Sequence, residues 1–177
     1  MKNSAFLFLF FFCLLSCKKT IPRNPVSKSN TSELQKTVNL NKRLFQIEQD
    51  IMKRYMDRDS TLTYHNSKKG FWYAYLQEDK NASCPIKGDT VFFEQEIIAL
   101  DGRVLYAKKD LGLRKYVIDK EHIIKGLKEG LKIMKEGDEV KFLFSSFVAY
   151  RMNGDSSKVI GSNQPVISRI KLVRINK

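Results

Sequence analysis

The sequence predicts an α+β domain, in which a mostly antiparallel sheet of five or six short strands wraps one short helix and follows an amphipathic helix. Several short runs rich in aromatic and β-branched residues are bounded by Gly, Pro and Asn, which is typical of strands and turns. Asp101-Gly102 lies between two such runs and is a strong hairpin signal. One later stretch, residues 123–134, has the apolar spacing of a helix instead.

The first helix is predicted from five apolar positions. Leu40, Leu44, Ile47, Ile51 and Tyr55 recur at steps of three or four residues with charged residues between them. This spacing indicates an amphipathic helix of roughly four turns. Its apolar stripe has two candidate partners, its own domain or a second copy of the chain.

The strands and the second helix follow in order. We expect strands at residues 71–76, 90–100, 103–107, 116–118, 140–144 and 166–175. The helix at 123–134 places Ile124, Leu127, Leu131 and Met134 on one face, with a glycine just beyond its end. Trp72, in the first strand, is expected to pack in the core and not to line a binding site.

The N-terminus has the features of an export signal. Lys2 is followed by an almost unbroken apolar run from Ala5 to Leu15, which is shorter than the ~20 residues a membrane span needs. The run ends at Ser16-Cys17, which resembles a bacterial lipobox. This resemblance implies cleavage before Cys17 and attachment of acyl chains to it. An uncleaved or plainly secreted N-terminus is the alternative.

Domain organisation follows from these features. Residues 1–16 form the predicted lipoprotein signal peptide, 17–32 a polar flexible tether, 33–69 an N-terminal helical segment and 70–177 the α+β domain. The net charge of +13 is compatible with nucleic acid, anionic lipid or an acidic polymer. The positive residues are scattered and no basic-aromatic nucleic-acid motif is present, so a solvated basic surface is expected and nucleic acid is not.

Cysteine and histidine usage limits the chemistry. Cys13 belongs to the signal and Cys17 to the lipid anchor, so Cys84 is left without a disulfide partner in the chain. The two histidines lie in unrelated contexts. We therefore expect no metal site, no cofactor and no cysteine nucleophile.

An ordered set of motifs resembles the FKBP-type peptidyl-prolyl cis-trans isomerases. The motifs are Gly88-Asp89-Thr90-Val91, Asp101-Gly102, Ile123-Ile124-Lys125-Gly126-Leu127-Lys128-Glu129-Gly130-Leu131, Met134-Lys135-Glu136-Gly137-Asp138 and Ala149-Tyr150, closing on a basic-apolar strand. The resemblance covers about residues 70–175. It implies an FKBP-like half-barrel. With the lipobox and the basic composition, the chain resembles the FKBP-type lipoproteins linked to gliding motility in bacteria.

The resemblance also implies site residues. Ile123 and Ile124 match the apolar pair at the helix start, where the second N–H holds a substrate carbonyl. Leu127 matches the floor position, often tryptophan. Tyr150 matches the tyrosine that donates a hydrogen bond, and Ile160 the isoleucine that covers the pocket. Without the resemblance, the helix residues would be assigned to the core, Tyr150 to the rim and Ile160 to a loop anchor.

Other positions depart from the family pattern. Leu105 stands at the aromatic position of the strand after the hairpin, and Tyr106 replaces an acidic residue that organises the site. Gln95 replaces a tyrosine, Arg114 a phenylalanine and Ser168 the phenylalanine of the last strand. These departures thin the aromatic wall and predict weak sensitivity to FK506-like ligands.

Two functions remain open for this fold. The first is a prolyl isomerase acting on Xaa-Pro segments of exported or envelope proteins, which needs no nucleophile or metal because only an amide bond rotates. The second is a non-catalytic FKBP-like chaperone or scaffold module. A basic lipoprotein that binds only anionic envelope polymer leaves the ordered motifs unexplained. With lysines and no aspartate after Cys17, we expect an outer-membrane anchor with the domain facing the periplasm.

Overall fold

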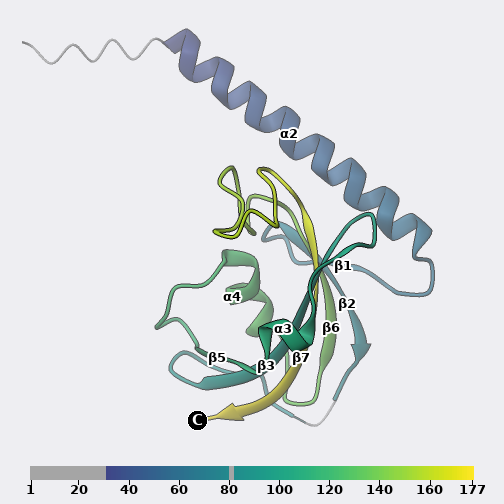
Figure 1. Ribbon diagram of the computed structural model, residues 1–177, viewed down its shortest axis with the longest axis vertical. Coiled ribbons are helices and arrows are strands. Elements are labelled where there is room, and N and C mark those ends of the chain that lie inside the picture. The colour runs from purple at the N-terminus through teal and green to yellow at the C-terminus, as the bar shows by residue number, and fades with distance from the viewer. Residues whose placement is uncertain (1–30, 80–81) are drawn as a thin grey trace, which may run out of the picture. The chain divides into compact units, whose positions relative to one another are not determined.

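The computed structural model describes residues 31–79 and 82–177 (Figure 1). The chain divides into residues 1–37 and 38–177, and of the first unit the described part is the start of helix α2 (Thr31–Arg58). The predicted signal peptide and the lipid attachment site, Cys17, lie outside the described residues. Among the residues that are described, no helix is both long and apolar enough to cross a membrane.

Seven antiparallel strands form one sheet in the described chain. The strands are β1 (His65–Asn66), β2 (Phe71–Gln77), β3 (Thr90–Ala99), β4 (Val104–Tyr106), β5 (Arg114–Val117), β6 (Glu139–Phe144) and β7 (Val166–Asn176). They are ordered β1-β2-β6-β7-β3-β4, and β5 also pairs with β3. The predicted α+β class with an antiparallel sheet is confirmed. The two-residue strand β1 was not predicted, because it is too short to show alternation.

The centre of the sheet is the pairing of β3 with β7. Ten residues of β3, from Thr90 to Ala99, find partners on β7. Burial alternates strictly along β3, so alternate side chains enter the core on one face of the sheet. The predicted hairpin closes β3 onto β4: Gly102 has a φ of 93°, and its N–H donates to the Ala99 carbonyl over 2.9 Å.

The main core lies between the sheet and helix α4 (Lys125–Leu131), which packs on one face of the sheet (Figure 1). Its fully buried members include Phe93, Tyr116, Leu127, Leu131, Met134, Phe142, Phe144 and Ile170. Gly126 allows the close approach of helix and sheet, since a Cβ there would lie 2.6 Å from the ring of Phe144. Helix and sheet are therefore locked together where α4 begins.

Helix α4 is shorter than the sequence predicted. It covers Lys125–Leu131 within the expected residues 123–134. Beyond Lys132, the N–H groups of Ile133 and Met134 donate to carbonyls three residues back, a tighter turn than an α-helix makes. Met134 is still buried, so the apolar spacing identified a core position beyond the helix end. A second short helix, α3 (Lys108–Leu111), was not predicted.

From Val38 onward, α2 packs on its own domain. Met52 is fully buried with Leu143 and Ile167, side chains on the sheet face opposite α4. The predicted stripe is only partly correct, because Leu40 and Ile47 are 57% and 53% exposed. The helix packs on the sheet through Met52 and its neighbours, so its buried face differs from the predicted apolar stripe. Trp72 packs beside this second cluster, as expected.

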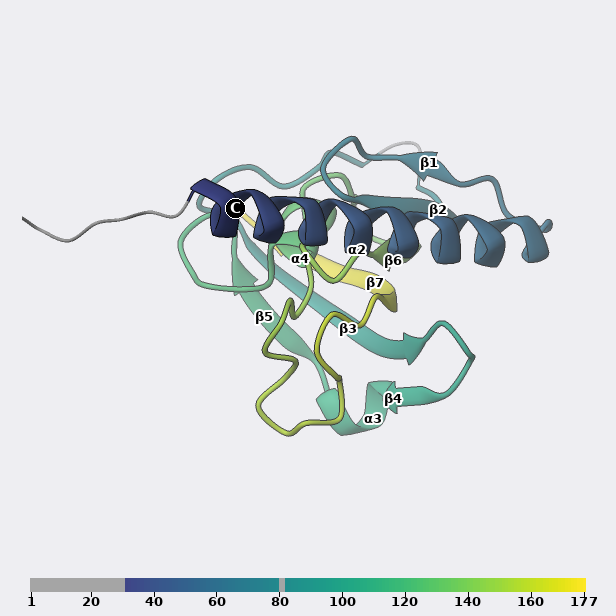
Figure 2. The same ribbon diagram turned by 90° about the horizontal axis from the view of Figure 1, so that it is seen from above.

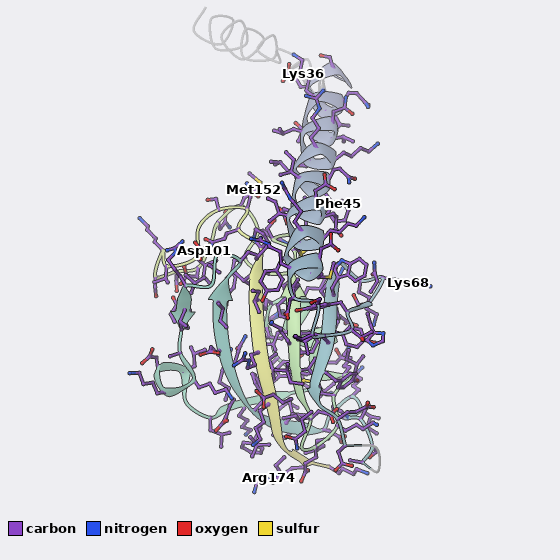
Figure 3. The ribbon with its side chains drawn as sticks, turned by 90° about the vertical axis from the view of Figure 1, so that its right-hand side faces the viewer. Lys36, Phe45, Lys68, Asp101, Met152 and Arg174 are labelled. Carbon is purple, nitrogen blue, oxygen red and sulfur yellow. The ribbon has the colours of Figure 1, made fainter. Side chains whose placement is uncertain are left out.

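The β3–β4 hairpin and the β6–β7 loop lie at the same end of the sheet. Asp101, at the tip of the β3–β4 hairpin, and Met152, in the loop between β6 and β7, lie toward the same end, whereas Arg174 lies at the other (Figure 3). The β6–β7 loop, seen from above in Figure 2, is joined to β4 by a hydrogen bond from Tyr106 to Asp155. The candidate site residues lie on these segments and on the start of α4.

Candidate active site

The start of α4 is fixed against the loop that follows β6. Ile124 caps the helix in an extended conformation, with φ −56° and ψ 140°, and its carbonyl accepts the first helical hydrogen bond from the Lys128 N–H. The Gly126 N–H donates to the Val148 carbonyl over 2.7 Å. Gly126 is two residues after Ile124 and Val148 two residues before Tyr150, so this bond holds the two predicted catalytic residues in one region.

The predicted apolar surface is present around this point. Leu127 and Ile160 are 1% exposed each, and the partly exposed Ile123, Ile124 and Leu105 pack against the same core. None of the described residues accepts a hydrogen bond from the Ile124 N–H. An amide donor beside an apolar surface suits a ligand that presents both a carbonyl and an aliphatic ring.

Tyr150 is half-buried and keeps its hydroxyl proton. Burial raises the pKa of the Tyr150 hydroxyl, and the nearby positive charge of Arg114 offsets part of this rise. No described residue pairs with the hydroxyl. The group is therefore a protonated donor free to bond to a ligand.

A carboxylate organises the loop over the site. Asp155 accepts a hydrogen bond from the Tyr106 hydroxyl and another, at 2.7 Å, from the Ile160 N–H. Burial alone would raise the pKa of Asp155, but these hydrogen bonds hold it below its ordinary value. Tyr106 stands at the position where the family has an acidic residue. Asp155, from the loop, supplies a carboxylate at this place and accepts the hydrogen bond of the Tyr106 hydroxyl.

Three departures from the family pattern are neighbours in the fold. Gln95 and Ser168 are each 1% exposed, and the Gln95 Nε2 donates to the Ser168 Oγ over 2.8 Å. The Arg114 guanidinium donates to the Gln95 Oε1 and lies 5.3 Å from the centre of the Phe93 ring. A polar chain, Arg114–Gln95–Ser168, therefore occupies the positions of the expected aromatic wall.

Residues 81–173 match the family model described as FKBP-type peptidyl-prolyl cis-trans isomerase. The chain belongs to this family.

Two relatives of this FKBP are informative. It is 36% identical over 91 residues to a protein named probable FKBP-type peptidyl-prolyl cis-trans isomerase FkpA from Neisseria meningitidis serogroup B, covering 51% of the chain and 33% of that protein. It also resembles the crystal structure of the three FKBP domains of wheat FKBP73, at 20% identity and a TM-score of 0.56, over 64% of the chain and 48% of that structure. The second likeness shows the fold alone. The chain thus spans a third of the curated relative.

The fold brings the site residues expected from the family, such as Ile124, Tyr150 and Ile160, to one core cluster. The sequence analysis did not identify the side chains that hold their loops in place. Asp155 bonds to Tyr106 and to the Ile160 N–H, and no motif marked it. Glu48 on α2 is 5% exposed and accepts two hydrogen bonds from Ser146, four residues before Tyr150. The only sign of this role in the sequence is that Glu48 lies among the apolar positions of α2, where a charged residue is typical of an exposed helix face.

The remaining reactive groups do not join the site. Cys84 is free and exposed. Within residues 31–79 and 82–177, no group of three His, Cys, Asp or Glu side chains could hold a metal ion.

Proposed function

We propose that this FKBP is a lipid-anchored prolyl isomerase that assists the folding of exported or envelope proteins, including those of gliding motility machinery. The observation that carries the isomerase function is a pair of donors, the Ile124 N–H and the Tyr150 hydroxyl, which have no acceptor among the described residues and lie beside the buried side chains of Leu127 and Ile160. Family membership supports the reaction, and the resemblance to gliding-associated lipoproteins supports the clients.

The reaction needs little more than this surface. A prolyl amide resists rotation with a barrier of ~18–20 kcal/mol, because the partial double bond must be lost. A twisted amide is less polar than a planar one, so an apolar site favours it. Donors that hold the carbonyl fix one side of the bond while the other turns. Each tenfold gain in rate requires only about 1.4 kcal/mol of such preference.

The test is the cis-to-trans rate of a proline-containing peptide with the full chain, beside Ile124→Asp and Tyr150→Phe. Ile124→Asp places a charge on the apolar surface and should abolish the acceleration. Ile86→Asp makes the same change at a residue that is 69% exposed and should leave the rate unchanged. A folded chain that is no faster than buffer on several Xaa-Pro peptides would refute the isomerase function.

The polar chain of Arg114, Gln95 and Ser168 favours a second candidate function, a non-catalytic FKBP-like chaperone or scaffold of the cell envelope. This function requires peptide binding without rate acceleration. Titration of a proline-containing peptide into the folded chain, followed by fluorescence, separates it from the first.

The proposed lipid anchor has its own test with a matched control. We propose that Cys17 carries acyl chains in the outer membrane, with the domain facing the periplasm. Cys17→Ala should abolish labelling by a radioactive fatty acid and release the protein from the membrane fraction. Cys13→Ala removes a thiol four residues earlier and should change neither. Equal labelling in both variants would refute the assignment.

A further inference from the structure

Arg114 is a partly buried cation with few partners. Its guanidinium donates to the Gln95 Oε1 and lies against the Phe93 ring, and among described residues it forms no ion pair. A guanidinium carries five N–H donors, of which Gln95 accepts only one. Burial lowers the pKa of the Arg114 guanidinium, because the charged form loses contact with water.

The position of this cation is fixed from inside the sheet. Gln95 is fully buried, and its Nε2 is committed to the Ser168 Oγ, which leaves its Oε1 turned to Arg114. Phe93 supports the guanidinium from the side at 5.3 Å. A surface arginine would have no such inner partners. The guanidinium is therefore pre-positioned, as a binding group is.

Arg114 belongs to the candidate proline site and not to a separate surface. Its guanidinium lies over the ring of Phe93, which belongs to the same core cluster that Tyr150 packs against, and its positive charge opposes the rise in the pKa of the Tyr150 hydroxyl. Tyr150 is the donor expected to hold the substrate. A residue next to the bound proline could therefore bring a group to Arg114.

The other charge at the site does not satisfy Arg114. Asp155 accepts from the Tyr106 hydroxyl and from the Ile160 N–H, and among the described residues it forms no ion pair with Arg114. The remaining guanidinium donors therefore suit a carboxylate brought by a ligand, since arginine and carboxylate form the strong charge-assisted pair. The net charge of +13 would also steer acidic segments toward the protein.

We propose that Arg114 forms a subsite for an acidic side chain adjacent to the bound proline, so that the protein selects Glu-Pro or Asp-Pro segments. This proposal rests on the proposed function, because it names the substrate class of the same site. Gln95 and Ser168 are positioning residues that hold the guanidinium.

The experiment measures kcat/KM and Kd of the full chain for four peptides that differ only before the proline, with Glu, Gln, Leu or Lys. Glu and Gln have nearly the same shape, so their ratio isolates the charge. We expect the Glu peptide to exceed the Gln peptide about fivefold to tenfold, and the ratio to fall as salt is raised. The Lys peptide should be the poorest.

Arg114→Met keeps the length of the side chain and should bring the Glu-to-Gln ratio to about one. Lys115→Met removes the same charge from an exposed neighbour on β5 and should keep the wild-type ratio. If Arg114→Met fails to fold by circular dichroism, Gln95→Leu replaces it, which frees the guanidinium from its inner partner and should lower the ratio.

Three outcomes are distinguishable. A wild-type ratio of one in both rate and affinity overturns the acidic subsite, even if all peptides are isomerised. Absence of turnover with a Glu preference in Kd that Arg114→Met abolishes supports the subsite and removes the isomerase function. An equal loss of preference in Lys115→Met would show general charge attraction and would overturn the assignment to Arg114.

Discussion

Replacing Glu48 with alanine should release the loop that carries Tyr150. The carboxylate comes from α2, and its two oxygens accept from the backbone N–H and the hydroxyl of Ser146, at 2.8 and 2.5 Å. The Ser146 carbonyl in turn accepts from the N–H groups of Ala149 and Arg151, which flank Tyr150. Glu48 therefore fixes the first residue of the turn on which the tyrosine sits.

The magnitude follows from the two bonds. Hydrogen bonds to a charged group contribute ~1.5–3 kcal/mol each, and the Ser146 donors would be left buried without a partner. The variant also avoids the cost of burying the carboxylate, which offsets part of the loss. We expect Glu48→Ala to lower the free energy of unfolding by about 3 kcal/mol. Glu48→Gln, which can accept from the N–H and donate to the hydroxyl oxygen, should lose about half as much.

Urea unfolding of the full chain measures these differences, and the peptide isomerisation rate shows whether Tyr150 is displaced. Asp50→Ala is the matched control, because Asp50 is an exposed acidic residue on the same helix. Ser146→Ala combined with Glu48→Ala completes a double-mutant cycle, in which the two losses should not add. If Glu48→Ala unfolds at the same urea concentration as Asp50→Ala, the carboxylate does not fix the loop.

Two further predictions concern packing and pH. Gly126→Ala gains about 1 kcal/mol of helix propensity but drives a methyl to 2.6 Å from the buried Phe144 ring, so we expect a net destabilisation of about 2 kcal/mol by urea unfolding. Gly130→Ala, at 3.0 Å from another ring, should cost less, and equal midpoints would contradict this. The hydrogen bond from Lys141 lowers the pKa of Asp59 below 3.8, so its contribution to stability is present above pH 3.8 and is lost as the pH falls through the lowered value. The difference between wild type and Asp59→Asn should therefore narrow at low pH, and a constant difference would contradict the assignment.

Much of the fold could be predicted because its signals are local. Alternation over β3 and β7, the Asp101-Gly102 hairpin and the spacing within α4 each depend on residues close in the chain. The surface on which α2 packs could not be predicted in this way, because Leu143 and Ile167 lie far from the helix in the sequence. Its exposed Leu40 and Ile47 have the same spacing as its buried side, and only the sheet decides which residues are covered.

The candidate site was predictable residue by residue, but its connections were not. Tyr150 and Ile124 could be placed by motif, whereas Asp155 lies in a loop with no pattern and bonds to Tyr106, 49 residues earlier. Glu48 and Ser146 are 98 residues apart. Hydrogen bonds across such separations depend on the folded geometry, which a spacing rule does not contain.

The polar residues at the site are an example, because their hydrogen bonds to one another are not visible in the sequence. Compared one at a time with the family, Gln95, Arg114 and Ser168 are three losses of aromatic surface. In the fold they are consecutive partners in one hydrogen-bonded chain, and each would leave a buried polar atom unsatisfied without the next. Each of the three polar side chains therefore depends on its neighbour in the chain for a hydrogen-bond partner. The donors beside the apolar surface, the Ile124 N–H and the Tyr150 hydroxyl, are untouched by the exchange. The exchange therefore leaves in place the two donors on which the proposed isomerase function rests.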